Sequence, residues 1–181
     1  MVAYELKRLE AGSVIEGFDC GNEDINGFLA EDARDYQDGL MAVTYLAVGS
    51  EDKDLVAYFC LLNDKLAYLP GDDKKAWNRL NRKVDNRKRM KSYPAVKIGR
   101  LGTSMKYARQ GVARELIDLV KLRFAVNNRT GCRFLTVDAH RDAIGLYEKC
   151  GFSFFTESDR DEETRLMYFD LKLFSDALKN G

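Results

Sequence analysis

The sequence predicts an α/β protein in which strands and helices alternate along most of its 181 residues. Residues 95–103 are apolar and extended-friendly, and they follow a proline that disfavours a helix just before them. Residues 111–128 then place apolar side chains at helical spacing. A second buried strand over 132–138 is followed by a short helix over 142–150. This order predicts a sheet covered by helices.

The first third of the chain predicts a strand, a helix and a hairpin. Residues 4–9 alternate partly and form the first strand. Asn22 can cap a helix that carries one apolar face and ends at a Gly after Asp38. Two strands follow, over 41–48 and 55–62, and a polar loop joins them. Their short spacing predicts an antiparallel pair.

A long connection, at about residues 70–94, stands where a short one would suffice. Trp77, Leu80 and Val84 are at helical spacing, so a helix with one apolar seam is expected over 72–84. The rest is basic, and a solvated surface is the favoured interpretation, with a substrate-facing flap as the alternative. The basic residues are Lys74, Lys75, Arg79, Arg82, Lys83, Arg87, Lys88, Arg89 and Lys91, against Asp85 alone.

The C-terminal part predicts two further strands, near 152–157 and over 164–173. A polar turn over 159–163 joins them. Leu166, Tyr168 and Leu171 do not alternate cleanly, so a bulge is expected in the last strand.

Composition predicts one domain over residues 1–181. With 45% apolar and 32% charged residues, the chain resembles soluble globular proteins, and a cytoplasmic location follows by default. A net charge of zero argues against polyanion binding by the whole molecule. The four cysteines lack CxxC spacing and accompany a single histidine, so no metal site and no disulfide framework is expected. Three of them, Cys60, Cys132 and Cys150, are expected mostly in the core.

Residues 109–114 stand where the predicted helix begins. The first N–H groups of a helix have no internal partner, and the helix dipole adds about half a positive charge there. A phosphate satisfies both. Gly111 allows close backbone approach, and Arg109 and Arg114 add guanidinium groups that suit phosphate oxygens. This stretch alone is as compatible with an ordinary strand–helix junction as with a phosphate site.

Two motifs resemble the GNAT-type N-acetyltransferase superfamily. Its acetyl-CoA loop, usually Gln/Arg-x-x-Gly-x-Gly/Ala, is matched at Gly111 and Ala113 but not at Ala108. Its second signature, Ala-x-x-x-Tyr-Glu-Lys-x-Gly-Phe, is matched in full over 143–152. The resemblance covers about residues 4–173. It implies the acyl-CoA N-acyltransferase fold, a central mixed, mostly antiparallel twisted sheet of about seven strands with helices on both faces.

The resemblance also implies acetyl-CoA as cofactor and acetyl transfer to a primary amine. In the family fold the central strand and its neighbour splay apart, and the pantetheine arm pairs with the exposed backbone. His140 stands where many relatives have an Asn that touches the cofactor, but it is also compatible with a base or a helix cap. The cofactor-binding residues implied in this way are Leu101, Gly102, Thr103, Arg109, Gln110, Gly111, Val112, Ala113, Arg114 and His140.

Tyr147 takes the role of the general acid by the same resemblance. A phenol with a pKa of about 10 is reasonably matched to an alkyl thiolate, whose reference pKa is about 8.5 or somewhat higher. The alternative is an aromatic residue that packs its helix on the sheet. The motif that follows it favours catalysis.

The central strand carries no Asp or Glu from Ala95 to Ser104, where many lysine-acetylating relatives have a general base. A lysine side chain has a pKa near 10.4, whereas an α-amine, at about 7.7–8.0, is already substantially uncharged at neutral pH. An enzyme without a strong base therefore suits an α-amine or another amine of low pKa.

Residues 18–29, 98–102 and 137–139 resemble a branch that includes toxin-type acetyltransferases, which act on the α-amine of aminoacyl-tRNA. The basic connection could then contact tRNA, although the zero net charge argues against it. The sequence leaves three functions open: acetylation of a small-molecule, peptide or protein amine, acetylation of aminoacyl-tRNA, and a non-catalytic acyl-CoA- or RNA-binding module. A homodimer is compatible with the family.

Overall fold

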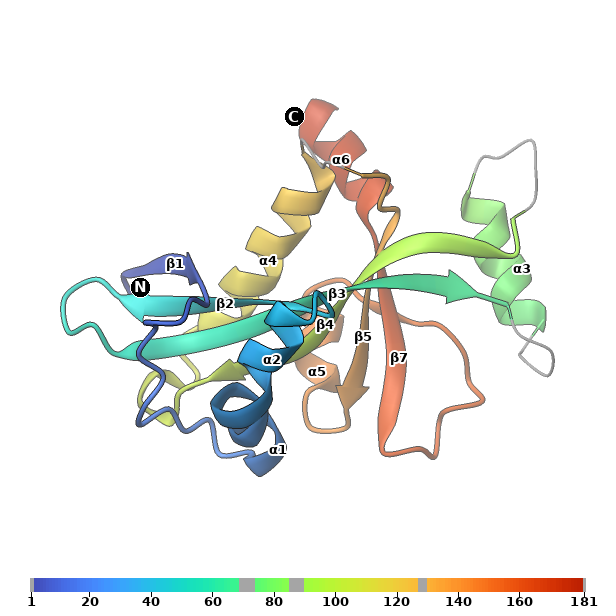
Figure 1. The fold of residues 1–181 in the computed structure, drawn as a ribbon. Helices are drawn as coiled ribbons and strands as arrows, with labels where there is room; N and C mark the ends of the chain where they lie inside the picture. The colour runs from blue at the N-terminus through green and yellow to red at the C-terminus, as the bar shows by residue number, and fades with distance from the viewer. Residues whose placement is uncertain (1, 69–73, 85–89, 127–129, 181) are drawn as a thin grey trace. The chain divides into compact units, whose positions relative to one another are not determined.

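The computed structural model describes residues 2–68, 74–84, 90–126 and 130–180. Its seven strands pair in the order β1-β2-β3-β4-β5-β7-β6 (Figure 1). The strands are β1 Tyr4–Arg8, β2 Val43–Gly49, β3 Leu55–Ala67, β4 Ser92–Thr103, β5 Phe134–His140, β6 Ser153–Phe154 and β7 Thr164–Asp170. The helices are α1 Glu23–Gly27, η1 Phe28–Asp32, α2 Ala33–Asp38, α3 Lys74–Lys83, η2 Met105–Tyr107, α4 Val112–Ala125, α5 Ile144–Lys149 and α6 Leu171–Asn180.

The chain forms two compact units, described separately below. The first comprises Met1–Asn63 with Ile98–Leu119, and the second comprises Asp64–Lys97 with Val120–Gly181. Strands β3 and β4 and helix α4 contribute residues to both. The sheet is mixed, because β4 and β5 are parallel while β1–β2, β2–β3, β5–β7 and β6–β7 are antiparallel. The predicted fold class is confirmed.

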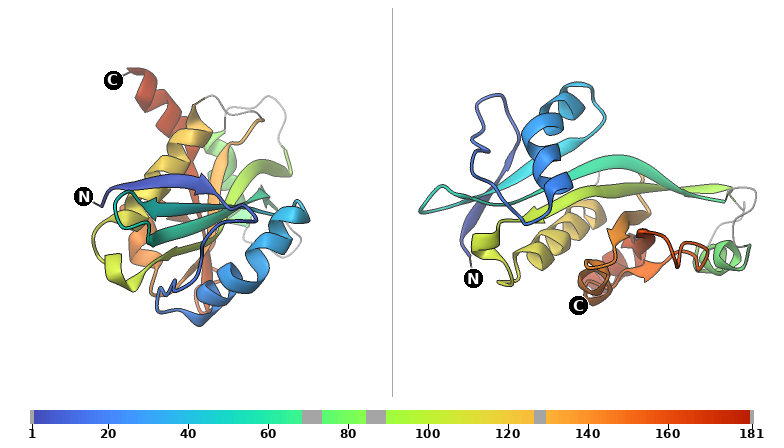
Figure 2. Two further views of the ribbon diagram at one scale, coloured as in Figure 1. Left: turned by 60° about the vertical axis from the view of Figure 1, so that its left-hand side comes forward. Right: turned by 90° about the horizontal axis from the view of Figure 1, so that it is seen from below.

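The first unit contains the predicted strand, capped helix and hairpin. The Asn22 side chain accepts a hydrogen bond from the Ile25 N–H at 3.1 Å and so caps α1. The helical segment packs on β2 and β3 through Phe28, Leu29 and Ala33. Figure 2 shows α1 and α2 on one face of these strands and the first half of α4 on the other.

The middle of that helical segment is a π-helix, which the apolar spacing did not predict. The Ala33 N–H bonds to the Phe28 carbonyl, five residues back. This wider turn lets Phe28 and Ala33 both point into the core, where they are 8% and 0% exposed.

The second unit has an aromatic core. Trp77 and Leu80 of α3 pack with Tyr93, Phe134 and Tyr168, which lie on β4, β5 and β7. The predicted helix in the long connection is therefore present. Its exposed side is basic, and Arg87, Lys88 and Arg89 lie outside the described residues.

The end of the chain was predicted wrongly. The last strand stops at Asp170 instead of continuing to 173, and α6 begins at Leu171. The Asp170 Oδ1 accepts the Lys172 N–H at 3.0 Å, so the carboxylate starts a helix. The uneven alternation that suggested a bulge was the start of helical spacing.

The four cysteines are all free. Cys60 and Cys150 are buried as expected, but Cys132 is only half-buried. Within the described residues, no helix is long and apolar enough to cross a membrane.

Candidate active site

The turn between β4 and α4 has the backbone conformation expected of an anion site. Arg109 and Gly111 both lie in the left-handed region, with φ of 61° and 87°. The first helical hydrogen bond runs from the Glu115 N–H to the Gly111 carbonyl at 3.1 Å. The N–H groups of residues 112–114 therefore precede the first intrahelical hydrogen bond and can donate hydrogen bonds to a ligand. A Cβ on Gly111 would meet no atom within 4 Å, so the approach is open.

Positive charge at this turn comes from Arg109 and Arg114, which are both exposed. The Arg114 guanidinium lies 3.9 Å from the Asp118 carboxylate one helical turn later, with both side chains more than half exposed. Such a pair is weak and leaves Arg114 able to bind another anion. The Gln110 side-chain amide donates to the Lys106 carbonyl at 3.3 Å and closes the turn.

The stretch of β4 before the turn packs tightly against the first helix. A Cβ on Gly102 would lie 2.8 Å from Ile25 Cγ2, 3.2 Å from Phe18 and 3.3 Å from Tyr58. Glycine is therefore required for α1 to lie this close to the strand. Leu101 and Thr103 are half-buried.

An ion pair joins α1 to the same strand. The Arg100 Nε lies 3.0 Å from the Asp24 carboxylate, and its guanidinium lies 5.5 Å from the Phe28 ring centre. Sequence reasoning did not single out either residue. A charged residue among the apolar positions of β4 was the available signal.

Tyr147 lies on α5 in the second unit and is 5% exposed. Its ring meets Phe152 edge-on at 5.3 Å. The buried Lys121 donates from Nζ to the Cys150 carbonyl at 2.6 Å, just after the last residue of α5. A cation at the C-terminus of a helix is favoured by the helix dipole, so Lys121 stabilises the helix that carries Tyr147.

His140 is the last residue of β5 and is half-buried. Its carbonyl accepts the Ala143 N–H at 2.9 Å, which starts the turn into α5. The residues predicted at the cofactor thus divide between the units. Leu101–Thr103 and Arg109–Arg114 belong to the first, whereas His140 and Tyr147 belong to the second.

Residues 86–173 match the model of the acetyltransferase (GNAT) domain. The match, over just under half of the chain, is to a GNAT-type acetyltransferase domain. The match includes both motifs, so the resemblance carried by residues 108–113 and 143–152 is confirmed. The domain makes the chain an acetyltransferase with acetyl-CoA as its cofactor.

Solved structures of GNAT-fold proteins cover nearly the whole chain. A mutant of KacT is 23% identical, with a TM-score of 0.76, and covers 96% of this chain and 98% of its own. AtaTR bound with acetyl-CoA is 19% identical, with a TM-score of 0.76, and covers 97% of each chain. AtaT complexed with acetyl-methionyl-tRNAfMet is 20% identical, with a TM-score of 0.77, and covers 97% of this chain and 99% of its own. These likenesses show the shared fold.

The first-unit residues fit the cofactor of a GNAT domain in two ways. The turn offers free N–H groups, two arginines and an open approach at Gly111. On β4, the Thr103 hydroxyl oxygen is buried and has no hydrogen-bond partner among the described residues, so it can accept or donate to a ligand.

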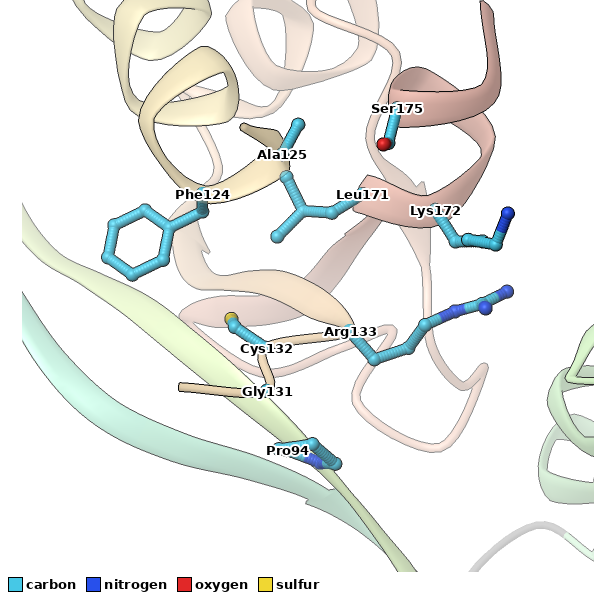
Figure 3. A pocket seen from close by; sticks show the side chains of 9 residues that line it. All are labelled: Pro94, Phe124, Ala125, Gly131, Cys132, Arg133, Leu171, Lys172 and Ser175. Atoms are coloured by element: carbon cyan, nitrogen blue, oxygen red, sulfur yellow. The ribbon is translucent and has the colours of Figure 1, made fainter. Parts of the chain in front are cut away.

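Two cavities are lined by other residues. A cavity of about 280 Å³ in the second unit is bounded by the end of α4, the residues before β5 and the start of α6 (Figure 3). A cavity of about 480 Å³ in the first unit is lined by Ser13, Val14, Ile15, Glu16, Gly17, Phe18, Asn26, Leu29, Ala30 and Arg34. Neither contains a residue predicted to bind the cofactor.

Proposed function

We propose that this acetyltransferase acts on a primary amine of low pKa, above all an α-amine. The observation that carries this proposal is the absence of an acidic residue on β4 from Ala95 to Ser104. Asp24 reaches the strand from α1, where its carboxylate pairs with Arg100. An acceptor that is already uncharged at neutral pH needs no such base.

In this proposal the turn holds the cofactor. The N–H groups of residues 112–114 and the side chains of Arg109 and Arg114 bind the diphosphate. The backbone of Leu101–Thr103 binds the pantetheine arm, and an N–H of this stretch polarises the carbonyl to be attacked. Bound acetyl-CoA supplies an acetyl group activated as a thioester.

Tyr147 holds the proton that the leaving thiolate takes up. Its phenol would supply this proton to the departing thiol and would regain one from solvent, which takes up the proton that the acetylated amine loses. The fully matched motif around it supports this role. Its placement on a helix stabilised by Lys121 gives the ring a fixed orientation.

Two matched peptides test the choice of amine. One has a free α-amine and no lysine, and the other has a blocked α-amine and one lysine. With acetyl-CoA present, release of free thiol at neutral pH should be much faster with the first. With rising pH the α-amine rate should level off above about 8, whereas a lysine rate would keep rising toward about 10.4. Faster acetylation of the lysine peptide at neutral pH contradicts the proposal.

The cavity of the first unit is the proposed place for the acceptor's side group. Val14, Ile15 and Leu29 give it an apolar lining, and Arg34 and Glu16 give it charge. Phe18 joins it to the cofactor strand, because it lines the cavity and also approaches Gly102.

A second candidate is the α-amine of aminoacyl-tRNA. The exposed side of α3 carries Lys74, Lys75, Arg79, Arg82 and Lys83, and the helix has no acidic residue. Such a face can bind phosphates of a nucleic acid. One similar structure, AtaT, holds acetyl-methionyl-tRNAfMet, and another has AtaT bound to the C-terminus of its antitoxin. The same likeness favours an antitoxin as a partner of this chain.

Expression in growing cells separates this candidate from the first. An enzyme that acetylates aminoacyl-tRNA should arrest growth, and Tyr147→Phe should abolish the arrest. Harmless expression of the unchanged chain would count against the tRNA substrate while leaving other α-amines possible.

A further inference from the structure

Four polar side chains from two distant segments meet beside the cofactor turn. Asp52 and Asp54 come from the β2–β3 loop, and Lys106 and Tyr107 come from η2. The Tyr107 hydroxyl donates to Asp52 Oδ2 at 2.5 Å and lies 3.4 Å from Asp54 Oδ2. The Lys106 ammonium donates to both carboxylates, at 3.1 Å and 2.5 Å. We call these four residues the hairpin anchor.

The β2–β3 loop is shaped to present Asp52. The Gly49 N–H donates to the Asp54 carbonyl at 2.8 Å, and the Asp54 N–H donates to Asp52 Oδ1 at 3.1 Å. A Cβ on Gly49 would lie 2.2 Å from Asp52 Oδ1, so only glycine leaves room for this carboxylate. One Asp52 oxygen is thus held by its own loop, and the other is directed to Tyr107.

Charge favours the same arrangement. The Tyr107 hydroxyl, the Asp54 N–H and Lys106 together lower the pKa of Asp52 to about 2. Asp52 in turn raises the pKa of Tyr107, and Asp54, followed by Tyr107 and Asp52, raises that of Lys106. Near neutral pH the anchor therefore consists of two carboxylates, an ammonium and a protonated phenol. Because Lys106 is engaged with both carboxylates, its charge is not directed at the turn.

The turn needs support of this kind. Arg109, two residues after Tyr107, is a non-glycine residue in the left-handed region. Such a conformation persists when the surrounding structure holds it. The Tyr107 ring is 9% exposed and fixed by its hydroxyl, so the chain enters the turn from a fixed point.

We propose that Asp52 and Tyr107 are positioning residues, which hold the turn at Arg109–Gly111 in the conformation that binds the cofactor's diphosphate. The inference rests on the proposed cofactor site. It predicts that these residues act on affinity for coenzyme A and not on the chemical step.

Calorimetric titration with coenzyme A tests this on three variants and one control. Tyr107→Phe keeps the buried ring and removes only the hydroxyl. Asp52→Asn removes the negative charge of the carboxylate that accepts the Tyr107 hydrogen bond. Both should weaken coenzyme A binding by about fivefold or more, and the double variant should be little weaker than either single one. Asp176→Asn breaks an exposed pair with Lys172 on α6 and should leave affinity unchanged.

The sign of the Asp52→Asn effect separates positioning from simple electrostatics. Removing a negative charge beside a diphosphate site should tighten binding if only Coulomb interactions act. The positioning role requires weaker binding in spite of that gain. With the α-amine peptide as acceptor, KM for acetyl-CoA should rise while kcat at saturation stays unchanged.

Each outcome decides the question. Unchanged or tighter binding in Asp52→Asn and Tyr107→Phe overturns the inference, provided that the unchanged chain binds coenzyme A. No binding by the unchanged chain would refute the cofactor site itself, and the inference with it. Thermal unfolding without ligand identifies a variant that does not fold. If Tyr107→Phe does not fold, Asp52→Asn decides the question, because the Asp52 side chain is 43% exposed.

Discussion

Replacing Gly111 with alanine tests whether the cofactor turn depends on backbone conformation or on space. Gly111 has a φ of 87°, and an added Cβ would meet no atom within 4 Å. The substitution therefore creates no steric contact and changes only the conformational preference. For an L-residue the left-handed region is disfavoured by about 1–2 kcal/mol. Since about 1.4 kcal/mol is a factor of ten, affinity for coenzyme A should fall about fivefold to thirtyfold.

Calorimetric titration measures that affinity, and Gly131→Ala provides the matched control. A Cβ on Gly131 would also meet nothing within 4 Å, but its φ is not in the left-handed region. The control should bind coenzyme A as the unchanged chain does. If Gly111→Ala also bound it with unchanged affinity, the reasoning that links this φ to diphosphate binding would be refuted.

Three further predictions concern the acid, the acceptor and pH. Tyr147→Phe should lower kcat by about a hundredfold or more, while calorimetry shows unchanged coenzyme A affinity; retained thiol release would exclude Tyr147 as the acid. Ala30→Phe should fill part of the first-unit cavity and narrow the range of amines acetylated in a mass-screened library, again without changing coenzyme A affinity. The pKa of Asp52 is lowered from 3.8 to about 2, so its contribution to stability is present above about 4 and is lost as pH falls toward 2. Asp52→Asn should therefore lose less stability than the unchanged chain between about pH 5 and 2 in urea unfolding; an equal loss would contradict this.

Local pattern was enough to predict most of the elements. The cap at Asn22, the loop between β2 and β3, and the helix that starts after Gly111 all follow from short-range rules about side chains and glycine. The helix around Trp77 in the long connection was found in the same way. The mixed, mostly antiparallel sheet was implied by the family resemblance, because no local rule specifies which strands become neighbours.

The error at the end of the chain had a local cause. The start of α6 could have been read from Asp170 and the apolar residues Leu171, Phe174 and Leu178, which follow helical spacing. The last strand was instead predicted to continue to residue 173, because Leu171 and Leu173 also suit a strand. The π-helix after Gly27 had no local signal. Its residues have ordinary helical spacing, and a turn takes in one extra residue only where packing against the core requires it.

The features missed altogether join segments that lie far apart in the sequence. Asp52 and Tyr107 are 55 positions apart, and Asp24 and Arg100 are 76 apart. A motif specifies what a turn can bind, because glycine and arginine at fixed spacing act locally. It does not specify what holds the turn in place, since any loop that the fold brings alongside can do so. The GNAT motif in this chain is incomplete at Ala108, just after the anchored Tyr107. The hairpin anchor holds the chain at Tyr107, two residues before the left-handed Arg109, so its loss should weaken coenzyme A affinity.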